Sequence, residues 1–287
     1  MCALLLLSGC GLSEAPLIDT KGPIATQERD LLFTAFGLML IVVVPVFVMT
    51  AVFCWRYRAS GGKGAYRPEW SSSMKIETVV WLVPACIIAV LGYLVWTYTH
   101  KLDPYKKLAS DGSSFEVQAI AQDWKWLFVY PELGVASVNE LAFPSNRPLS
   151  LKITSDTVMN SFMIPALGGQ IYAMAGMTTR LNLIADEPGN FRGRNTMYSG
   201  DGFSDQHFQA IAMSDEDFAS WTNKVQSAPQ SLDASTYANL VKPSIANAVT
   251  YYSSVEPSLF EKIVRKYAAH ECSGQTQVGQ YICRGSR

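Results

Sequence analysis

Two long runs without a charged side chain restrict most strongly what this chain can fold into. Residues 31–55 read LLFTAFGLMLIVVVPVFVMTAVFCW, and residues 78–98 read TVVWLVPACIIAVLGYLVWTY. At about 1.5 Å of rise per residue, a helix of either length crosses a hydrocarbon core of about 30 Å. The alternative, two buried helices of a globular core, is disfavoured because such helices rarely run this far without a polar face. The runs therefore predict transmembrane helices over residues 31–55 and 76–98.

The charges between these runs predict the orientation of the chain. The connecting segment, residues 56–75, has the single acid Glu69. Its basic residues are Arg56, Arg58, Lys63, Arg67 and Lys75. The positive-inside rule therefore places this segment in the cytoplasm, and both ends of the chain on the periplasmic side. A composition that is 49% hydrophobic and 16% charged, with a net charge of -1, gives no reason to expect nucleic acid.

The first ten residues, MCALLLLSGC, form a short apolar run that ends in a cysteine. The run resembles the lipobox of bacterial lipoproteins, in which the cysteine is lipidated and becomes the new N-terminus. It predicts a signal segment over residues 1–9 and an exported, lipid-anchored N-terminus over residues 10–30, with lipid on Cys10. The run lacks the basic region expected of a signal peptide. An unprocessed apolar end, with Cys10 as an ordinary thiol, is the alternative.

The other cysteines divide between the membrane runs and the exported part. Cys54 and Cys86 lie inside the membrane runs, where a thiol behaves as a small hydrophobe. Cys272 and Cys283 lie in a polar exported tail, and an oxidising compartment allows them to form a disulfide. A pair of free thiols is an equally good alternative. Histidines that would complete a zinc site are missing from this spacing, so we expect no metal there.

Residues 110–213 have the pattern of a β domain. Short segments rich in β-branched or aromatic residues are FEVQAIAQDWKWLFVY, PLSLKITS, TTRLNLIA and HFQAIA. Gly, Pro, Asn and Asp separate them, which predicts antiparallel strands in a sandwich or barrel. After Ser214, a plausible N-cap, DEDFASWTNKVQ and EPSLFEKIVRKYAAH have helical spacing. Residues 214–287 are therefore expected to form a short helical tail.

Several motifs occur in a fixed order along the chain. They are KIETVVWLVP, AQDWKW, VMNSFMIPALGGQIYAMAG and YSGDGFSDQHF. Together with two membrane helices before an exported β domain, they resemble subunit II of the haem-copper terminal oxidases, and most of all that of the bo-type ubiquinol oxidases. The resemblance covers nearly the whole chain. It implies a helical hairpin in the membrane, then an exported cupredoxin-like sandwich without copper, then the short helical tail.

The resemblance also identifies the positions of a metal centre. In the cytochrome c oxidases of this family, the cupredoxin domain holds two copper ions through an upstream histidine and a Cys-x-Glu-x-Cys-x-x-x-His-x-x-Met run. Thiolate, imidazole and thioether ligands suit copper. In this sequence the upstream histidine is replaced by Asn160, the cysteines by Tyr198 and Gly202, the glutamate by Gly200, the later histidine by Gln206 and the methionine by Gln209. The resemblance therefore implies that this subunit binds no metal.

The motifs also allow us to predict the environment of three further residues. His207 lies one residue from the ligand position, and on a strand that shift turns a side chain to the other face. We therefore expect a surface or hydrogen-bonded histidine. Trp124 and Trp126 are expected to pack, with Asp123 and Lys125 on the opposite face of the same strand.

Glu77, in KIETVVW, matches the family position that helps protons into subunit I. An ionisable group at a membrane boundary can collect a proton from bulk water. The alternative is an interfacial glutamate favoured by the positive end of its helix.

The resemblance implies a non-redox second subunit of a ubiquinol oxidase in the bacterial inner membrane. The complex would oxidise ubiquinol, reduce dioxygen to water and translocate protons. Subunit I would carry the haems, the copper and the quinol pocket, so no residue of this chain is expected to be catalytic. The expected partners are subunit I, further small membrane subunits and the lipid bilayer. Two alternatives stay open, namely a cytochrome c oxidase subunit II and a non-enzymatic membrane lipoprotein that only binds a partner.

Overall fold

The computed structural model describes residues 15–58, 68–69, 71–108 and 113–273, and of residues 269–273 only the backbone. It contains a pair of long helices, residues 27–103, and a second unit made of the N-terminal segment and residues 104–287. The predicted lipidation site Cys10 and the predicted disulfide partner Cys283 lie outside the described residues. The side chain of Cys272 also lies outside them, so the lipid anchor and the disulfide stay predictions.

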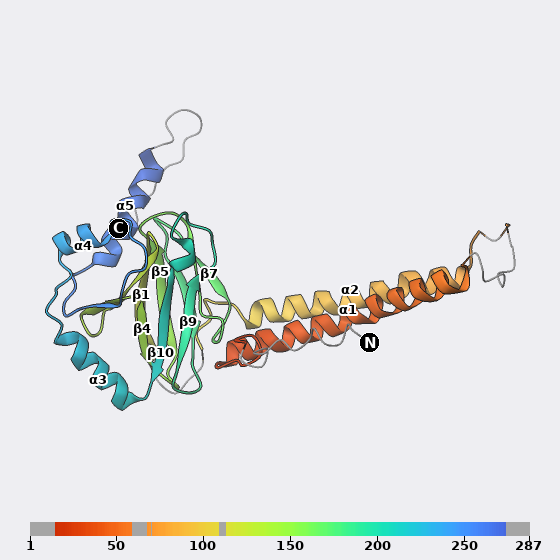
Figure 1. The fold of residues 1–287 in the computed structure, drawn as a ribbon, viewed down its shortest axis with the longest axis horizontal. Helices are drawn as coiled ribbons and strands as arrows, with labels where there is room; N and C mark the ends of the chain where they lie inside the picture. The colour runs from red at the N-terminus through yellow and green to blue at the C-terminus, as the bar shows by residue number, and fades with distance from the viewer. Residues whose placement is uncertain (1–14, 59–67, 70, 109–112, 274–287) are drawn as a thin grey trace. The chain divides into compact units, whose positions relative to one another are not determined.

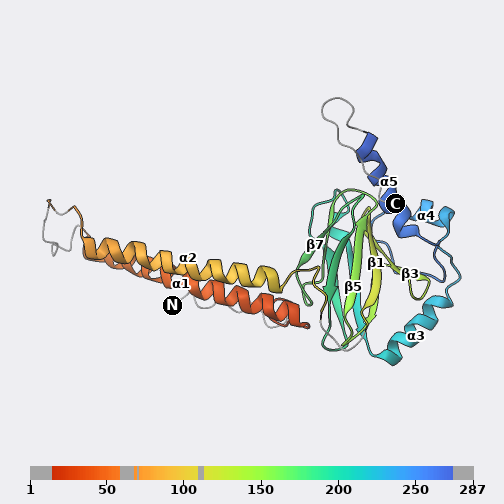
Figure 2. The same cartoon turned by 180° about the vertical axis from the view of Figure 1, so that it is seen from behind.

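Two helices are long and apolar enough to cross a membrane. They are α1 (Pro23–Arg56) and α2 (Met74–Lys101), which run side by side in Figures 1 and 2. Helix α1 begins at Pro23 rather than at residue 31, because a proline fits the first helical position, where no backbone N–H is needed. The free thiols of Cys54 and Cys86 are exposed on these helices.

The second unit is a sandwich of a six-stranded and a five-stranded sheet (Figure 1). In spatial order, the six-stranded sheet contains β11 (Thr250–Tyr252), β3 (Val135–Val138), β2 (Lys125–Tyr130), β1 (Phe115–Gln122), β5 (Leu149–Ser155) and β8 (Thr179–Leu183). The five-stranded sheet contains β4 (Glu140–Pro144), β10 (His207–Met213), β9 (Gly189–Asn195), β6 (Asn160–Met163) and β7 (Gln170–Ala173). The predicted strands are not all antiparallel, because β1 pairs with β5 and β4 pairs with β10 in parallel.

An aromatic cluster fills the space between the sheets. Trp126, Phe128, Phe162 and Phe208 are fully buried there, and the rings of Trp126 and Phe162 meet edge to face at 5.2 Å between centroids. Phe208 lies opposite Gly193 on the neighbouring strand, and a Cβ at Gly193 would collide with the Phe208 ring. The glycine in β9 therefore makes room for the largest side chain of β10.

The segment after residue 213 is more than the helical tail that the sequence predicts. It contains α3 (Asp215–Gln226), α4 (Ala234–Leu240) and α5 (Leu259–Ser273), and also β11, which extends the six-stranded sheet beside β3. Ser214 caps α3 as predicted, since its side chain accepts a hydrogen bond from the Asp217 N–H at 3.1 Å. A second apolar cluster packs the helices onto the sheet. Its members include Ile120 and Leu127 of the sheet and Leu259, Phe260 and Ile263 of α5.

Candidate functional site

The structure brings together two of the residues predicted at copper positions. Asn160 opens β6, and Gln206 ends the loop that connects β9 to β10. Between them lies Asn195, the last residue of β9, to which the sequence motifs gave no role. Only 0%, 3% and 1% of Asn160, Asn195 and Gln206 are exposed, respectively. Three side-chain amides thus occupy the centre of the candidate site.

Asn195 forms hydrogen bonds to both of the other amides. Its Nδ2 donates to Asn160 Oδ1 at 2.7 Å and to Gln206 Oε1 at 2.8 Å. Its Oδ1 accepts from the backbone N–H groups of Ser161 at 2.8 Å and Met197 at 3.0 Å. One side chain therefore connects the two positions that are histidines in copper-binding relatives with the backbone around them.

The outer atoms of the network also have partners. Asn160 Nδ2 donates to the Val158 carbonyl at 2.8 Å, and Gln206 Nε2 donates to the Gln122 carbonyl at 3.2 Å. The Ser199 hydroxyl donates to Gln206 Oε1 at 2.9 Å. A buried polar network is stable when its donors and acceptors are paired, and this one is paired at each amide. Neutral amides that are already hydrogen-bonded do not fit copper, which prefers thiolate, imidazole and thioether ligands.

The loop between β9 and β10 leaves no room at Gly202 for the cysteine side chain that copper-binding relatives have at this position. A Cβ at Gly202 would fall against the indole ring of Trp124, and Gly200 has a φ of 107°, a conformation that side chains rarely adopt. Trp124 holds the loop from the other side, because its Nε1 donates to the Ser199 carbonyl at 3.2 Å. The tryptophan ring therefore occupies the space that the side chain of a metal ligand at residue 202 would need.

The expected single strand around Trp124 is wrong. Residues 123–124 form a turn between β1 and β2, and Trp124 has a φ of 62°, so Trp124 and Trp126 do not share a strand face. Asp123 accepts a hydrogen bond from the Thr157 hydroxyl. Both tryptophans nevertheless pack, Trp126 in the core and Trp124 on the loop.

Lys125, which the sequence pattern placed on the strand face opposite the two tryptophans, is fully buried. Its Nζ donates to the Lys242 carbonyl at 2.8 Å and to the Ser244 hydroxyl at 2.6 Å. Burial lowers the pKa of Lys125, with an opposing effect from the charge of Asp123. This lysine therefore joins the sandwich to the segment before β11, which no sequence motif indicated.

The remaining predicted positions form no hydrogen bonds with the three amides. Tyr198 is 73% exposed, and its ring contacts that of Phe203. Gln209 is half-buried on β10, on the strand face opposite the buried Phe208. His207 is also half-buried, and its Nδ1 atom is buried with no hydrogen-bond partner in the part of the chain that the structure describes.

Glu77 lies in the first turn of α2 and is exposed. It belongs to the pair of long helices and not to the sandwich that holds the amide network.

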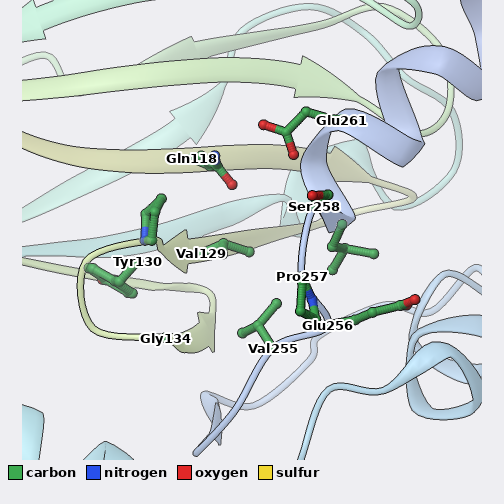
Figure 3. A pocket seen from close by; sticks show the side chains of 11 residues that line it. Gln118, Val129, Tyr130, Gly134, Val255, Glu256, Pro257, Ser258 and Glu261 are labelled. Atoms are coloured by element: carbon green, nitrogen blue, oxygen red, sulfur yellow. The ribbon is translucent and has the colours of Figure 1, made fainter.

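A hollow of about 300 Å³ lies elsewhere on the sandwich, where the turn after β2 meets the start of α5. Figure 3 shows Gln118 from β1 and Glu261 from α5 among its lining residues. Its other acid, Glu256, is paired with Lys262. The hollow lies away from the amide network and shares none of its residues.

Comparisons with known proteins identify the family. Residues 94–205 match the model of the cytochrome c oxidase subunit II periplasmic domain, and residues 226–271 match the COX aromatic rich motif. The chain is 54% identical over 266 residues to cytochrome bo(3) ubiquinol oxidase subunit 2 of Pseudomonas aeruginosa, which covers 93% of this chain and 80% of that protein. The chain belongs to the ubiquinol oxidase subunit II family. Ubiquinol oxidase subunit 2 of Acetobacter aceti is 47% identical over 92% of this chain and 85% of that protein.

Membership of the ubiquinol oxidase subunit II family confirms the predicted resemblance and the predicted fold class of two apolar helices, a cupredoxin-like sandwich and a C-terminal helix. Among solved structures, the periplasmic domain of subunit II of cytochrome oxidase of Bradyrhizobium japonicum aligns at 23% identity. That alignment has a TM-score of 0.38 and covers 40% of this chain and 96% of that one. The aromatic rich motif explains the segment that the sequence pattern reduced to a tail, because its residues supply α4, β11 and α5.

Proposed function

We propose that this chain is the non-redox second subunit of a membrane complex that oxidises ubiquinol, reduces dioxygen to water and translocates protons. The amide network carries the proposal, because Asn160, Asn195 and Gln206 satisfy one another where copper-binding relatives need ligands. The names of the similar proteins, which are ubiquinol oxidase subunits, support the same conclusion.

The absence of copper ligands fits a substrate that dissolves in the bilayer. A water-soluble donor such as cytochrome c needs an electron port outside the membrane, whereas a quinol can deliver electrons to a haem of the membrane partner directly. The haems, the copper of the oxygen-reducing site and the quinol pocket would then belong to subunit I. This chain would bind subunit I and further small membrane subunits and support their assembly, with no catalytic residue of its own.

The proposed topology follows from charge and from the family. The basic segment between α1 and α2 would lie in the cytoplasm of a bacterial inner membrane, and the sandwich would lie in the periplasm. Lipid on Cys10 would anchor the N-terminus to the outer leaflet, and Cys272 and Cys283 would form a disulfide in this oxidising compartment. Glu77 would take up protons at the cytoplasmic end of α2.

The test is to purify the complex through this subunit in mild detergent and to measure copper per haem and oxygen uptake. We expect copper only at the level of the oxygen-reducing site, with uptake driven by ubiquinol and not by reduced cytochrome c. Additional copper, or uptake driven by cytochrome c, would overturn the proposal and make the sandwich an electron port. Purification without any haem protein would instead favour a lipoprotein that only binds a partner.

A further inference from the structure

A small hollow lies beside the amide network, on the outer side of strands β9 and β10. Its volume is about 210 Å³, and its lining includes Arg192, Arg194, Ser204 and His207. In the antiparallel register, His207 lies opposite Arg194, and Gln209 lies opposite Arg192. Side chains two residues apart on a strand share a face, so the two arginines and His207 lie on one face of the sheet.

The positive charge of this hollow has no counter-charge within ion-pair distance. Within the described part of the chain, the side chains of Arg192 and Arg194 form no ion pair and no hydrogen bond, and both are exposed. The nearest acid along the loop, Asp205, accepts a hydrogen bond from the Ser204 hydroxyl at 3.4 Å. Glu140, two strands from β9, is held by Trp221 and Tyr251. Both guanidinium groups are therefore free to form charge-assisted hydrogen bonds to an anion.

His207 is half-buried beside the two arginines. Its Nδ1 atom is buried and has no hydrogen-bond partner among the described residues. Because this atom has no exposed surface, it faces the protein rather than the hollow, and the recognition of a ligand rests on the two arginines.

We propose that this hollow binds a phosphate-class oxyanion, supplied either as free phosphate or as the phosphate of a lipid headgroup. Guanidinium groups match phosphate oxygens with paired N–H donors. A volume of about 210 Å³ suits a small anion better than a drug-sized organic ligand, whose pockets are larger. The site is separate from the proposed oxidase activity and needs none of the amide positions to be a metal ligand.

The experiment uses the whole oxidase complex, purified in detergent at low ionic strength. Isothermal titration calorimetry with inorganic phosphate would compare the wild type with the double variant Arg192→Ala, Arg194→Ala. Native mass spectrometry of the same samples would count bound phospholipids. Arg180→Ala is the matched control, because Arg180 is an exposed arginine on β8 of the other sheet. Unfolding midpoints of the variants should equal that of the wild type, since all three arginines are exposed.

For a free phosphate ion, we expect the double variant to bind inorganic phosphate at least about tenfold more weakly, because it lacks both groups that donate charge-assisted hydrogen bonds to the anion. For a lipid headgroup, we expect instead that the double variant loses a phospholipid that the wild type retains. Equal results for wild type and double variant in both measurements would overturn the proposal. So would a loss of the same size in Arg180→Ala.

Discussion

At the scale of single residues, Asn195 has the largest expected effect. Substituting Asn195→Ala removes the donor to Asn160 and Gln206 and the acceptor for two backbone N–H groups. Because these groups stay buried, we expect a loss of about 3 kcal/mol in the local free energy of opening. Hydrogen exchange at the amides of β9 and β10 measures it.

Tyr198→Ala is the control for that measurement, since Tyr198 lies in the same loop but is 73% exposed. Its exchange should match the wild type. If Asn195→Ala exchanged no faster than Tyr198→Ala, the network would not stabilise the strands.

Gly202 and Trp124 should be energetically coupled. Gly202→Ala places a methyl group against the Trp124 indole, which we expect to cost about 1–3 kcal/mol. In a Trp124→Gly background the same substitution should cost much less, because the ring is gone and glycine tolerates the positive φ at residue 124. Thermal unfolding of the four proteins of this double-mutant cycle gives the coupling. Additive effects would show that the loop moves away from the ring.

The sequence identified the positions at which copper-binding relatives have ligands, but not the residues that form hydrogen bonds around these positions. Asn160 and Gln206 stand at positions that a family motif identifies. Asn195 belongs to no motif, and the motif that contains Lys125 gives it no role in the site. Their partners are far along the chain, at residue 160 and at residue 242. Burial of such side chains is decided by strand pairing, which a local pattern does not contain.

At the scale of elements, strands with long alternating or aromatic segments were predictable. The segments that became β1, β2, β5, β8 and β10 were all identified in the sequence. Strand β9, GNFRGRN, was missed because its glycine, asparagine and arginine residues disfavour a strand. It forms because β10 and β6 pair with its two edges. Strand β11 was also missed. It has only three residues, and it is a strand because it pairs with β3.

Asp156 ties the end of β5 to two C-terminal helices. Its side chain is 1% exposed and accepts hydrogen bonds from Tyr237 of α4 at 2.6 Å and Lys266 of α5 at 2.8 Å. Asp156→Asn would remove the charge that holds Lys266, so we expect α5 to open more easily by about 2 kcal/mol. Hydrogen exchange along α5 measures this. The control is Glu256→Gln, because Glu256 forms a more exposed ion pair with Lys262 of the same helix. An equal effect in both variants would contradict the prediction.

The same contact predicts weakening at alkaline pH. Burial lowers the pKa of Lys266, but the hydrogen bond and charge of Asp156 outweigh it and raise the pKa above 10.5. Burial, with the charge of Asp156, raises the pKa of Tyr237 above 10.0. Groups with raised folded pKa values stabilise the fold fully below their unfolded pKa and lose that stabilisation as the pH rises. Exchange in α5, corrected for its intrinsic pH dependence, should therefore be constant near neutral pH and accelerate above about pH 10, and less so in Asp156→Asn.

At the scale of the whole molecule, Glu77 is the residue through which this chain would affect turnover. Glu77→Gln in the assembled complex should slow ubiquinol-driven oxygen uptake by roughly tenfold, which corresponds to a barrier raised by about 1.4 kcal/mol. Glu69→Gln, an exposed acid of the segment between the two helices, is the control. Haem content must stay unchanged in both, so that assembly and turnover are separated. Turnover equal in both variants would leave Glu77 as an ordinary interfacial glutamate.

The filled amide network has a consequence for how this family can change over generations. A histidine introduced at residue 160 or 206 would break the hydrogen bonds of Asn195, and a cysteine introduced at residue 202 would displace Trp124. Each such change alone would cost stability, and none would create a copper centre until the others were present. Single substitutions therefore offer no gradual path from the present sequence to a metal site.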